Sequence, residues 1–272
     1  ANADASYAGE MTLTDAVKWS KNTVAWNIYQ QITPKTGSSF LIKMGFHKIW
    51  VDKDYNAGAL GGFTYGVTTE EMAGGYAALA NDGVYRKATC IRLIVDASNK
   101  TVVNETNRDS KVYDKSASRM MTQMLREVVL SGTGTSANVE NAVVAGKTGT
   151  TNASKDVWFC GYSKYYTTTV WAGYDYPKEM SGVNSRVNAI FKDFMTAVHT
   201  NLPVTDFSTV TQQTTQPETT AAVQEETESL PQETTAIVPE TTGIEQVTPQ
   251  QVPSTTAQVS TTTPYQRWTT AP

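Results

Sequence analysis

The stretch Val144-Ala145-Gly146-Lys147-Thr148-Gly149-Thr150-Thr151 is the most informative segment of the chain. It predicts a β-strand that carries one lysine between hydroxyl side chains and glycines. Glycine lets a strand approach a ligand closely, and an ammonium group with two hydroxyls can hold a carboxylate. We therefore expect acyl-transfer chemistry on a peptide that ends in a carboxylate. A Lys-Thr-Gly tripeptide alone occurs by chance in about one chain of this length in fifteen, so support must come from the surrounding sequence.

The sequence around this strand predicts a small antiparallel sheet. Strands are expected at residues 143–151, 157–162 and 168–174, and their short connections indicate antiparallel neighbours. A long helix that begins after Asp114 precedes them, and a helix at residues 188–199 follows. This order predicts an α/β (α+β) fold in which helices cover an antiparallel sheet.

The first hundred residues are expected to be mainly helical. Thr12 and Asp15 resemble a capping box, and the segment from Trp19 to Asn22 interrupts the helical period because Ser and Asn compete for backbone hydrogen bonds. The other expected elements are a helix at 24–32 ended by Pro34, a short helix at 39–44, a loop at 52–66, a helix at 69–81 and a hairpin at 91–103.

Two helices show apolar faces that we expect to lie in the core. In the helix after Asp114, the face is formed by Met120, Met121, Met124, Leu125, Val128 and Val129. In the last helix, the residues at core spacing are Ile190, Phe191, Phe194 and Val198.

Composition divides the chain into two regions. Residues 204–272 hold 7 of the 10 prolines, 20 threonines, 8 acidic residues and one basic residue. Such a segment cannot bury enough apolar surface to offset the entropy of ordering its backbone, so we expect a disordered acidic tail. Residues 1–203, with 21 basic and 18 acidic residues, are expected to form the folded domain, and this balance gives no reason to expect a nucleic-acid partner.

Several site types are not expected. The two cysteines, Cys90 and Cys160, lack metal-ligand spacing, and they could form a disulfide or remain reduced. His47 and His199 belong to no zinc-binding motif. No stretch of 18 apolar residues is present. We expect neither a metal ion nor another cofactor.

A second candidate motif is Ser20-Lys21-Asn22 at the expected helix interruption. The Ser-x-Asn spacing alone is uninformative, and each candidate has a plain structural interpretation. Ser20 could be a turn residue, Asn22 a helix cap and Lys147 a solvated edge-strand residue.

The order of the motifs resembles the transpeptidase domain of class A penicillin-binding proteins. The segments that carry the resemblance lie at residues 7–20, 59–77, 131–134, 145–162, 171–175 and 191–195. They are similar to the family's Ser-x-Asn region, its LGG…GVT segment, its SGTG turn and its AGKTGTT…DxWFxGY strands. The resemblance implies the fold shared by serine β-lactamases and transpeptidases, and it covers about residues 7–203.

The resemblance implies specific roles for six residues. Ser20 would relay the leaving group's proton, Asn22 would hydrogen-bond the substrate amide, and Lys147 would hold the terminal carboxylate electrostatically. The substrate-binding residues would be Thr148, Gly149 and Thr150: the two hydroxyls contact the carboxylate, and the glycine leaves the strand open. The backbone N–H of Thr150 would form part of the oxyanion hole.

The family has one more motif, Ser-x-x-Lys, which supplies the nucleophilic serine and is absent from the 272 residues. We therefore expect the chain to be the C-terminal portion of a bifunctional, membrane-anchored enzyme whose nucleophile, glycosyltransferase domain and anchor lie upstream. The resemblance implies an extracytoplasmic DD-transpeptidase of the bacterial cell envelope. Its hydrolytic relatives are β-lactamases and D-Ala-D-Ala carboxypeptidases. Expected partners are peptidoglycan stem peptides, β-lactams, and cell-wall division or elongation proteins. The alternative is an inactive wall-associated or β-lactam-sensing module.

Overall fold

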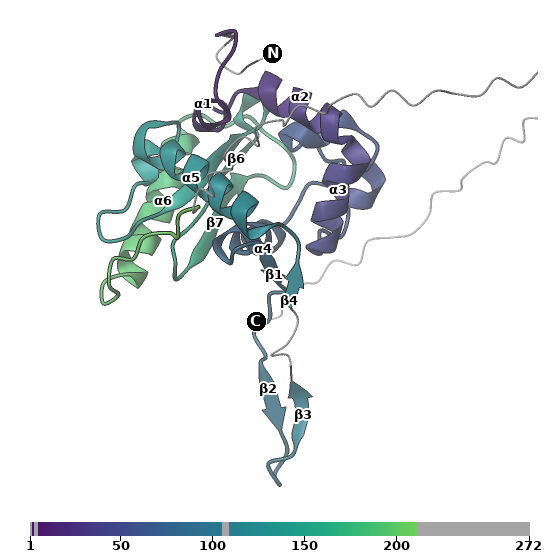
Figure 1. The fold of residues 1–272 in the computed structure, drawn as a ribbon, viewed down its shortest axis with the longest axis vertical. Coiled ribbons are helices and arrows are strands. Elements are labelled where there is room, and N and C mark those ends of the chain that lie inside the picture. The colour runs from purple at the N-terminus through teal and green to yellow at the C-terminus, as the bar shows by residue number, and fades with distance from the viewer. Residues whose placement is uncertain (1, 3–4, 105–108, 211–272) are drawn as a thin grey trace, which may run out of the picture. The chain divides into compact units, whose positions relative to one another are not determined.

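The computed structural model describes residue 2, residues 5–104 and residues 109–210 of the chain. Its central feature is the sheet β5 (Ala145–Thr150), β6 (Asp156–Tyr162) and β7 (Thr167–Gly173), in that spatial order and antiparallel throughout (Figure 1). In the register, Lys147 is opposite Cys160 and Trp158 is opposite Trp171. The three predicted strands and their antiparallel pairing are confirmed.

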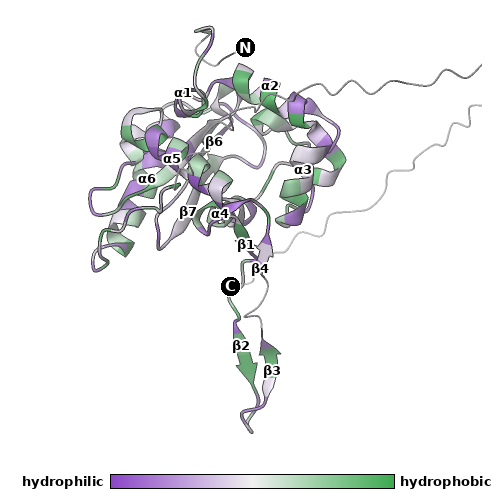
Figure 2. Cartoon of the chain, in the orientation of Figure 1, coloured by the Kyte–Doolittle hydropathy of each residue, from purple (hydrophilic) through white to green (hydrophobic). Residues whose placement is uncertain are grey.

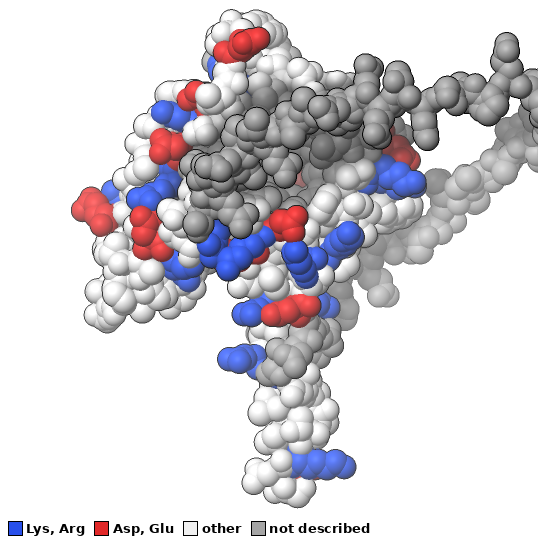
Figure 3. All heavy atoms as spheres, in the orientation of Figure 1, with Lys and Arg blue, Asp and Glu red and all other residues white. Residues whose placement is uncertain are grey.

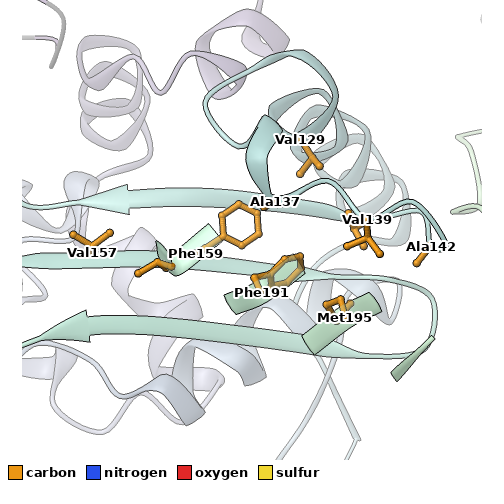
Figure 4. Close-up of a cluster of buried hydrophobic side chains, with 10 residues drawn as sticks. Val129, Ala137, Val139, Ala142, Val157, Phe159, Phe191 and Met195 are labelled. Atoms are coloured by element: carbon orange, nitrogen blue, oxygen red, sulfur yellow. The ribbon is translucent and has the colours of Figure 1, made fainter. Parts of the chain in front are cut away.

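Helices cover this sheet, as predicted, and they lie on both of its faces. On one face, α6 (Val183–Val198) places Phe191 against Phe159 of β6, with ring centroids 4.5 Å apart (Figure 4). On the other face, Tyr162 packs with Leu125 of α5 (Lys115–Ser131) and Tyr76 of α4 (Thr69–Ala80). The fold belongs to the expected class.

The remaining elements connect and flank this core. The other helices are α1 (Leu13–Lys18), α2 (Asn22–Ile32) and α3 (Pro34–Lys43), and the single-turn 3-10 helices are η1 (Ile49–Asp52), η2 (Asn56–Leu60), η3 (Thr135–Ala137) and η4 (Asn152–Ser154). Strand β1 (Val84–Arg86) pairs with β4 (Asp109–Lys111), and β2 (Leu93–Val95) pairs with β3 (Thr101–Asn104).

Side-chain caps fix the starts of α1, α3 and α4, and the cap of α3 is Thr33, which accepts a hydrogen bond from the backbone of Thr36 at 3.3 Å. Thr12 accepts a hydrogen bond from the backbone of Asp15 at 3.1 Å, as expected for α1. For α4, Thr68 and Glu71 form a capping box. The cap residue is thus Thr68, not the predicted Thr69.

Three predicted element limits are wrong. Helix α3 begins at Pro34, which was expected to end the preceding helix, because proline fits the first turn, where its missing N–H costs nothing. The reversal between α2 and α3 occurs at Thr33, whose φ is 68°. Helix α6 begins at Val183, five residues before the expected start, and the predicted loop at 52–66 contains η2.

The apolar faces are also narrower than predicted. In α5, Leu125, Val128 and Val129 are buried, but Met120 is 49% exposed and Met121 is 36% exposed. In α6, Phe191 is buried, whereas Ile190 and Phe194 are 56% and 49% exposed.

The predicted hairpin exists as β2 and β3, and all but one of the side chains in these two strands are exposed. Leu93, Ile94 and Val95 remain 42–55% accessible although β2 is strongly apolar (Figure 2). The register shifts between Ile94 and Val95, so the pairing of the two strands is irregular there. The short sheet formed by β1 and β4 was not predicted.

Residues 204–210 pack on the domain and do not begin the expected tail. Asp206 pairs with Arg126 of α5 at 2.7 Å, and Phe207 meets the Tyr162 ring edge-on, with centroids 5.5 Å apart. The limit predicted at residue 203 is therefore wrong by at least seven residues. The rest of the predicted tail, residues 211–272, lies outside the described residues.

Surface charge and the cysteines indicate no additional site in the described part of the chain. Basic and acidic side chains are interspersed on the face shown in Figure 3. Cys90 is exposed and Cys160 is buried, and both are free, so the disulfide alternative is wrong. Burial raises the pKa of Cys160 to about 12. None of the described helices has both the length and the apolar character needed to cross a bilayer.

Candidate active site

All six predicted site residues line one cleft. The cleft has a volume of about 1180 Å³, and its lining includes Ser20, Asn22, Lys147, Thr148, Gly149 and Thr150. Its walls come mainly from α1, α2 and β5, with further lining residues from η2, α4, β6 and α6. The fold therefore brings together two predicted motifs that lie far apart in the sequence.

Ser20 lies just beyond the end of α1 in a left-handed backbone conformation. Its φ is 54°, a region that non-glycine residues seldom adopt and that marks functional positions more often than chance. The neighbouring Lys21 donates its N–H to Ala16 O at 2.9 Å. The chain thus reverses sharply before α2 begins at Asn22.

The central contact of the cleft joins the two motifs directly. Lys147 Nζ donates a hydrogen bond to Ser20 Oγ at 2.8 Å and another to the backbone carbonyl of Thr148 at 3.0 Å. Among the described residues, no carboxylate lies within ion-pair distance of Lys147. Because the amine is largely buried, its pKa falls from 10.5 to about 8.

The backbone of β5 presents an N–H group on the side away from β6. Thr151 donates its N–H to Asp156 O at 3.0 Å, and backbone groups alternate in direction along a strand. The N–H of Thr150 and the carbonyl of Thr148 therefore face away from β6. The contact between Lys147 Nζ and Thr148 O fits this direction.

The two glycines of β5 do different things. A Cβ on Gly146 would lie 2.7 Å from the Phe159 ring and 2.9 Å from Cys160 O, so this glycine permits close packing inside the sheet. A Cβ on Gly149 would meet only Trp158, at 3.3 Å. Gly149 lines the cleft, and its missing side chain keeps that surface open.

Two cleft residues that had no predicted role hold the strand's hydroxyls. Thr133, in the turn after α5, shares a 2.8 Å hydrogen bond with Thr148, and its N–H donates to Lys18 O at 3.3 Å. Asn184, in the first turn of α6, accepts a hydrogen bond from Thr150 Oγ1 at 3.3 Å. Thr133 could have been predicted as a site residue, because it lies in the SGTG-like turn of the sequence. Asn184 belongs to no recognisable motif and could not have been predicted.

A serine–histidine pair elsewhere is structural. Ser163 Oγ lies 2.8 Å from His199 Nε2, but these residues are only 3% and 2% exposed. The Ser163 hydroxyl also accepts the N–H groups of Tyr165 and Tyr166, which fixes a turn. No substrate could reach this pair, and the cleft remains the candidate site.

The cleft combines a cation of lowered pKa, a serine hydroxyl, two threonine hydroxyls and an outward backbone N–H. This set can bind a carboxylate, move a proton between an amine and a hydroxyl, and stabilise an oxyanion. Of the described residues, no group of three His, Cys, Asp or Glu side chains is arranged to hold a metal ion.

The sequence matches the family profile described as "Penicillin binding protein transpeptidase domain" over residues 1–196. Penicillin-binding protein 1F of Bacillus subtilis is 35% identical over 204 residues, which cover 72% of this chain and 28% of that protein. Penicillin-binding protein 1A of Aquifex aeolicus is 38% identical over 213 residues, which cover 76% of this chain and 28% of that protein. The chain thus spans just over a quarter of the length of these two relatives.

Solved structures share the fold. The PonA1 protein of Mycobacterium tuberculosis, in complex with penicillin V, aligns with a TM-score of 0.64 and 21% identity over 76% of this chain and 61% of that one. Penicillin-Binding Protein 1A of Haemophilus influenzae aligns with a TM-score of 0.60 and 22% identity over 76% of this chain and 37% of that one.

Proposed function

Because the chain belongs to the penicillin-binding protein transpeptidase family, we propose that its cleft serves a DD-transpeptidase of bacterial peptidoglycan synthesis. The reaction would be serine acyl transfer on stem peptides that end in D-Ala-D-Ala, with β-lactams as competing acylating ligands. The observation that carries the proposal is the 2.8 Å hydrogen bond from Lys147 to Ser20, which unites two motifs 127 residues apart.

The proposed chemistry assigns the nucleophilic serine and its lysine to a segment that precedes this chain. That serine would attack the penultimate D-alanine carbonyl, the carbonyl oxygen would become an oxyanion, and the terminal D-alanine would leave as an amine after taking up a proton. An acceptor amine would then attack the acyl-enzyme and release the serine. The Thr150 N–H would hydrogen-bond the oxyanion, and such a donor is worth about 3–4 kcal/mol in the transition state.

The other cleft residues have supporting roles in this proposal. Lys147 and Ser20 would deliver the leaving group's proton, since an amine with a pKa of about 8 can both hold and release a proton near neutral pH. Asn22 would hydrogen-bond the substrate amide. Thr148 and Thr150 would bind the terminal carboxylate beside the Lys147 charge.

The proposal extends to the cellular setting. An enzyme of this kind would act outside the cytoplasmic membrane, held there by an anchor in the preceding segment, and would work with cell-wall division or elongation proteins. Some relatives with the same motifs are carboxypeptidases, which transfer the acyl group to water. Transpeptidation and hydrolysis differ only in the acceptor of the acyl group, which is an amine in the first and water in the second.

A fluorescent penicillin tests the proposal. The 272-residue chain should form no covalent adduct, while the longer protein, meaning this chain with its preceding coding sequence, should be labelled at a serine outside these residues. In the longer protein, Ser20→Ala should slow labelling about 10²–10⁴-fold, the usual contribution of positioned proton transfer.

Two outcomes would contradict the proposal. Labelling of the 272-residue chain, abolished by Ser20→Ala, would make Ser20 the nucleophile, with Lys147 as its base. A preceding sequence without Ser-x-x-Lys, together with no labelling of the longer protein, would instead favour an inactive wall-associated or β-lactam-sensing module.

A further inference from the structure

The hydroxyl of Thr150 is already engaged before any ligand arrives. Its proton is donated to Asn184 Oδ1 at 3.3 Å. A hydroxyl has a single proton. While that proton points at Asn184, Thr150 can accept a hydrogen bond from a ligand but cannot donate one. A carboxylate, which only accepts, cannot gain a hydrogen bond from Thr150 in this state.

Asn184 occupies a position suited to influence an anion. It is the second residue of α6, a 16-residue helix, and it lines the cleft with Thr150. The helix start has no acidic residue in its first turn and no side-chain cap; its N-cap, Gly182, has a φ of 67°. The dipole of α6 therefore adds a positive potential near Thr150. The side chain of Asn184, which contacts Thr150 at this helix start, is neutral.

A primary amide offers an acceptor and a donor on one carbon. Rotation about the last side-chain bond of Asn184 exchanges Oδ1 and Nδ2. In the rotated state, Nδ2 donates to Thr150 Oγ1, and the hydroxyl proton becomes free to point into the cleft. The result is a chain of two hydrogen bonds, from the amide to the hydroxyl and from the hydroxyl to the anion.

We propose that Asn184 is a positioning residue that makes Thr150 a donor only when an anionic ligand occupies the cleft, so that it contributes to selection for a terminal carboxylate. The inference rests on the proposed function, because it takes the carboxylate of the stem peptide or the β-lactam as the ligand group beside Thr150. The same side chain acts through Thr150 and needs no contact with the ligand.

Aspartate is the informative substitution. Both oxygens of a carboxylate only accept hydrogen bonds, so Asn184→Asp should fix the Thr150 proton away from the ligand and add a negative charge. Asn184→Ala removes the competing acceptor and leaves the hydroxyl free. Ser185→Asp is the matched charge control, because Ser185 is exposed, lies in the same helical turn and donates to Gly182 O.

The test compares the second-order acylation rates of the longer protein with benzylpenicillin and with its methyl ester. For Asn184→Asp, we expect at least about a tenfold loss with benzylpenicillin, as loss of one hydrogen bond to a charged group predicts. The rate with the ester should stay within about twofold of wild type. Asn184→Ala should lose no more than about threefold, and Ser185→Asp no more than about twofold.

Three results would overturn the inference. Equal losses for Asn184→Asp and Ser185→Asp would show a through-space charge effect. Equal losses with acid and ester for Asn184→Asp would show a general structural role, and unchanged rates for Asn184→Asp would show no role. If the wild-type protein is labelled by neither probe, the proposed function fails, and the inference fails with it.

Discussion

Strands β5 and β7 are the two outer strands of one sheet, and both pair with β6, yet their sequences follow opposite rules. In β7, five of seven residues are Thr, Val or Trp, which favour strands. In β5, four of six are Ala, Gly or Lys, which disfavour them. Strand β5 is therefore stabilised by tertiary packing, for example of Gly146 on Phe159, and not by the strand propensity of its own residues. Residues of low strand propensity occur here because the cleft requires a cation and an exposed backbone.

The largest expected effect comes from Lys147→Met, which should separate stability from function. The lysine's pKa of about 8 in the folded protein lies below its ordinary value of 10.5. A charged amine at this position therefore destabilises the fold by about 3 kcal/mol below pH 8. The variant should be more stable by up to this amount at pH 7, and labelling of the longer protein should fall more than about a hundredfold.

The pH dependence of the free energy of unfolding tests whether the Lys147 charge destabilises the fold. Between pH 8 and 10.5 the unfolded chain holds a proton on Lys147 that the folded chain has lost, so stability should rise with pH. Urea unfolding across this range should show the rise in the wild type relative to Lys147→Met, so that the two converge near pH 10.5. Lys155→Met, at an exposed lysine, should leave the profile unchanged; a constant difference between wild type and Lys147→Met would contradict the account.

Gly146→Ala should be the most damaging small change in β5. The added methyl would press on the Phe159 ring and on a backbone oxygen that cannot move aside. We expect a loss of about 1–3 kcal/mol in the free energy of unfolding. In β7, Thr167→Val should change it by no more than about 0.5 kcal/mol. Similar losses in the two strands would remove the distinction between them.

Gly149→Ala should affect the ligand more than the fold. Its Cβ would meet Trp158 at 3.3 Å and otherwise face the cleft. Denaturant unfolding should show a loss below about 1 kcal/mol, whereas penicillin labelling of the longer protein should slow about tenfold as the methyl obstructs the ligand. A large stability loss with normal labelling would place Gly149 with Gly146 as a packing residue.

The smallest effect on penicillin labelling is expected in β7. Trp171 donates its indole N–H to Asp156 Oδ1 at 3.1 Å and is 37% exposed. Trp171→Phe should lose about 0.5–1.5 kcal/mol, the contribution of one hydrogen bond, and should leave labelling unchanged. A labelling defect would show that the cleft depends on both outer strands.

Much of the fold was predictable because its signals are local. The Thr12 cap, Asp114 at the N-cap position of α5 (where its side chain makes no capping hydrogen bond), the short turns between the strands and the glycines after α5 all lie within a few residues of the elements they limit. Pro34 misled the prediction because proline both ends and begins helices, and only the left-handed Thr33 before it decides between the two.

The structure brings the six predicted site residues to one cleft, but the sequence did not reveal the contacts among them. Ser20 and Lys147 belong to recognisable motifs, so the cleft could be anticipated. Asn184 is a polar residue with no motif, and its role depends on where α6 begins relative to Thr150. The packing of Phe207 on Tyr162 likewise depends on a long-range contact that composition cannot reveal.

A crystal structure of the longer protein acylated by penicillin would show directly whether β5 holds the ligand's carboxylate. If β5 holds the ligand, its carboxylate should lie about 2.5–3.0 Å from the hydroxyls of Thr148 and Thr150, beside Lys147, along the open side of β5. A carboxylate directed away from β5, toward α2 or into solvent, would contradict this expectation.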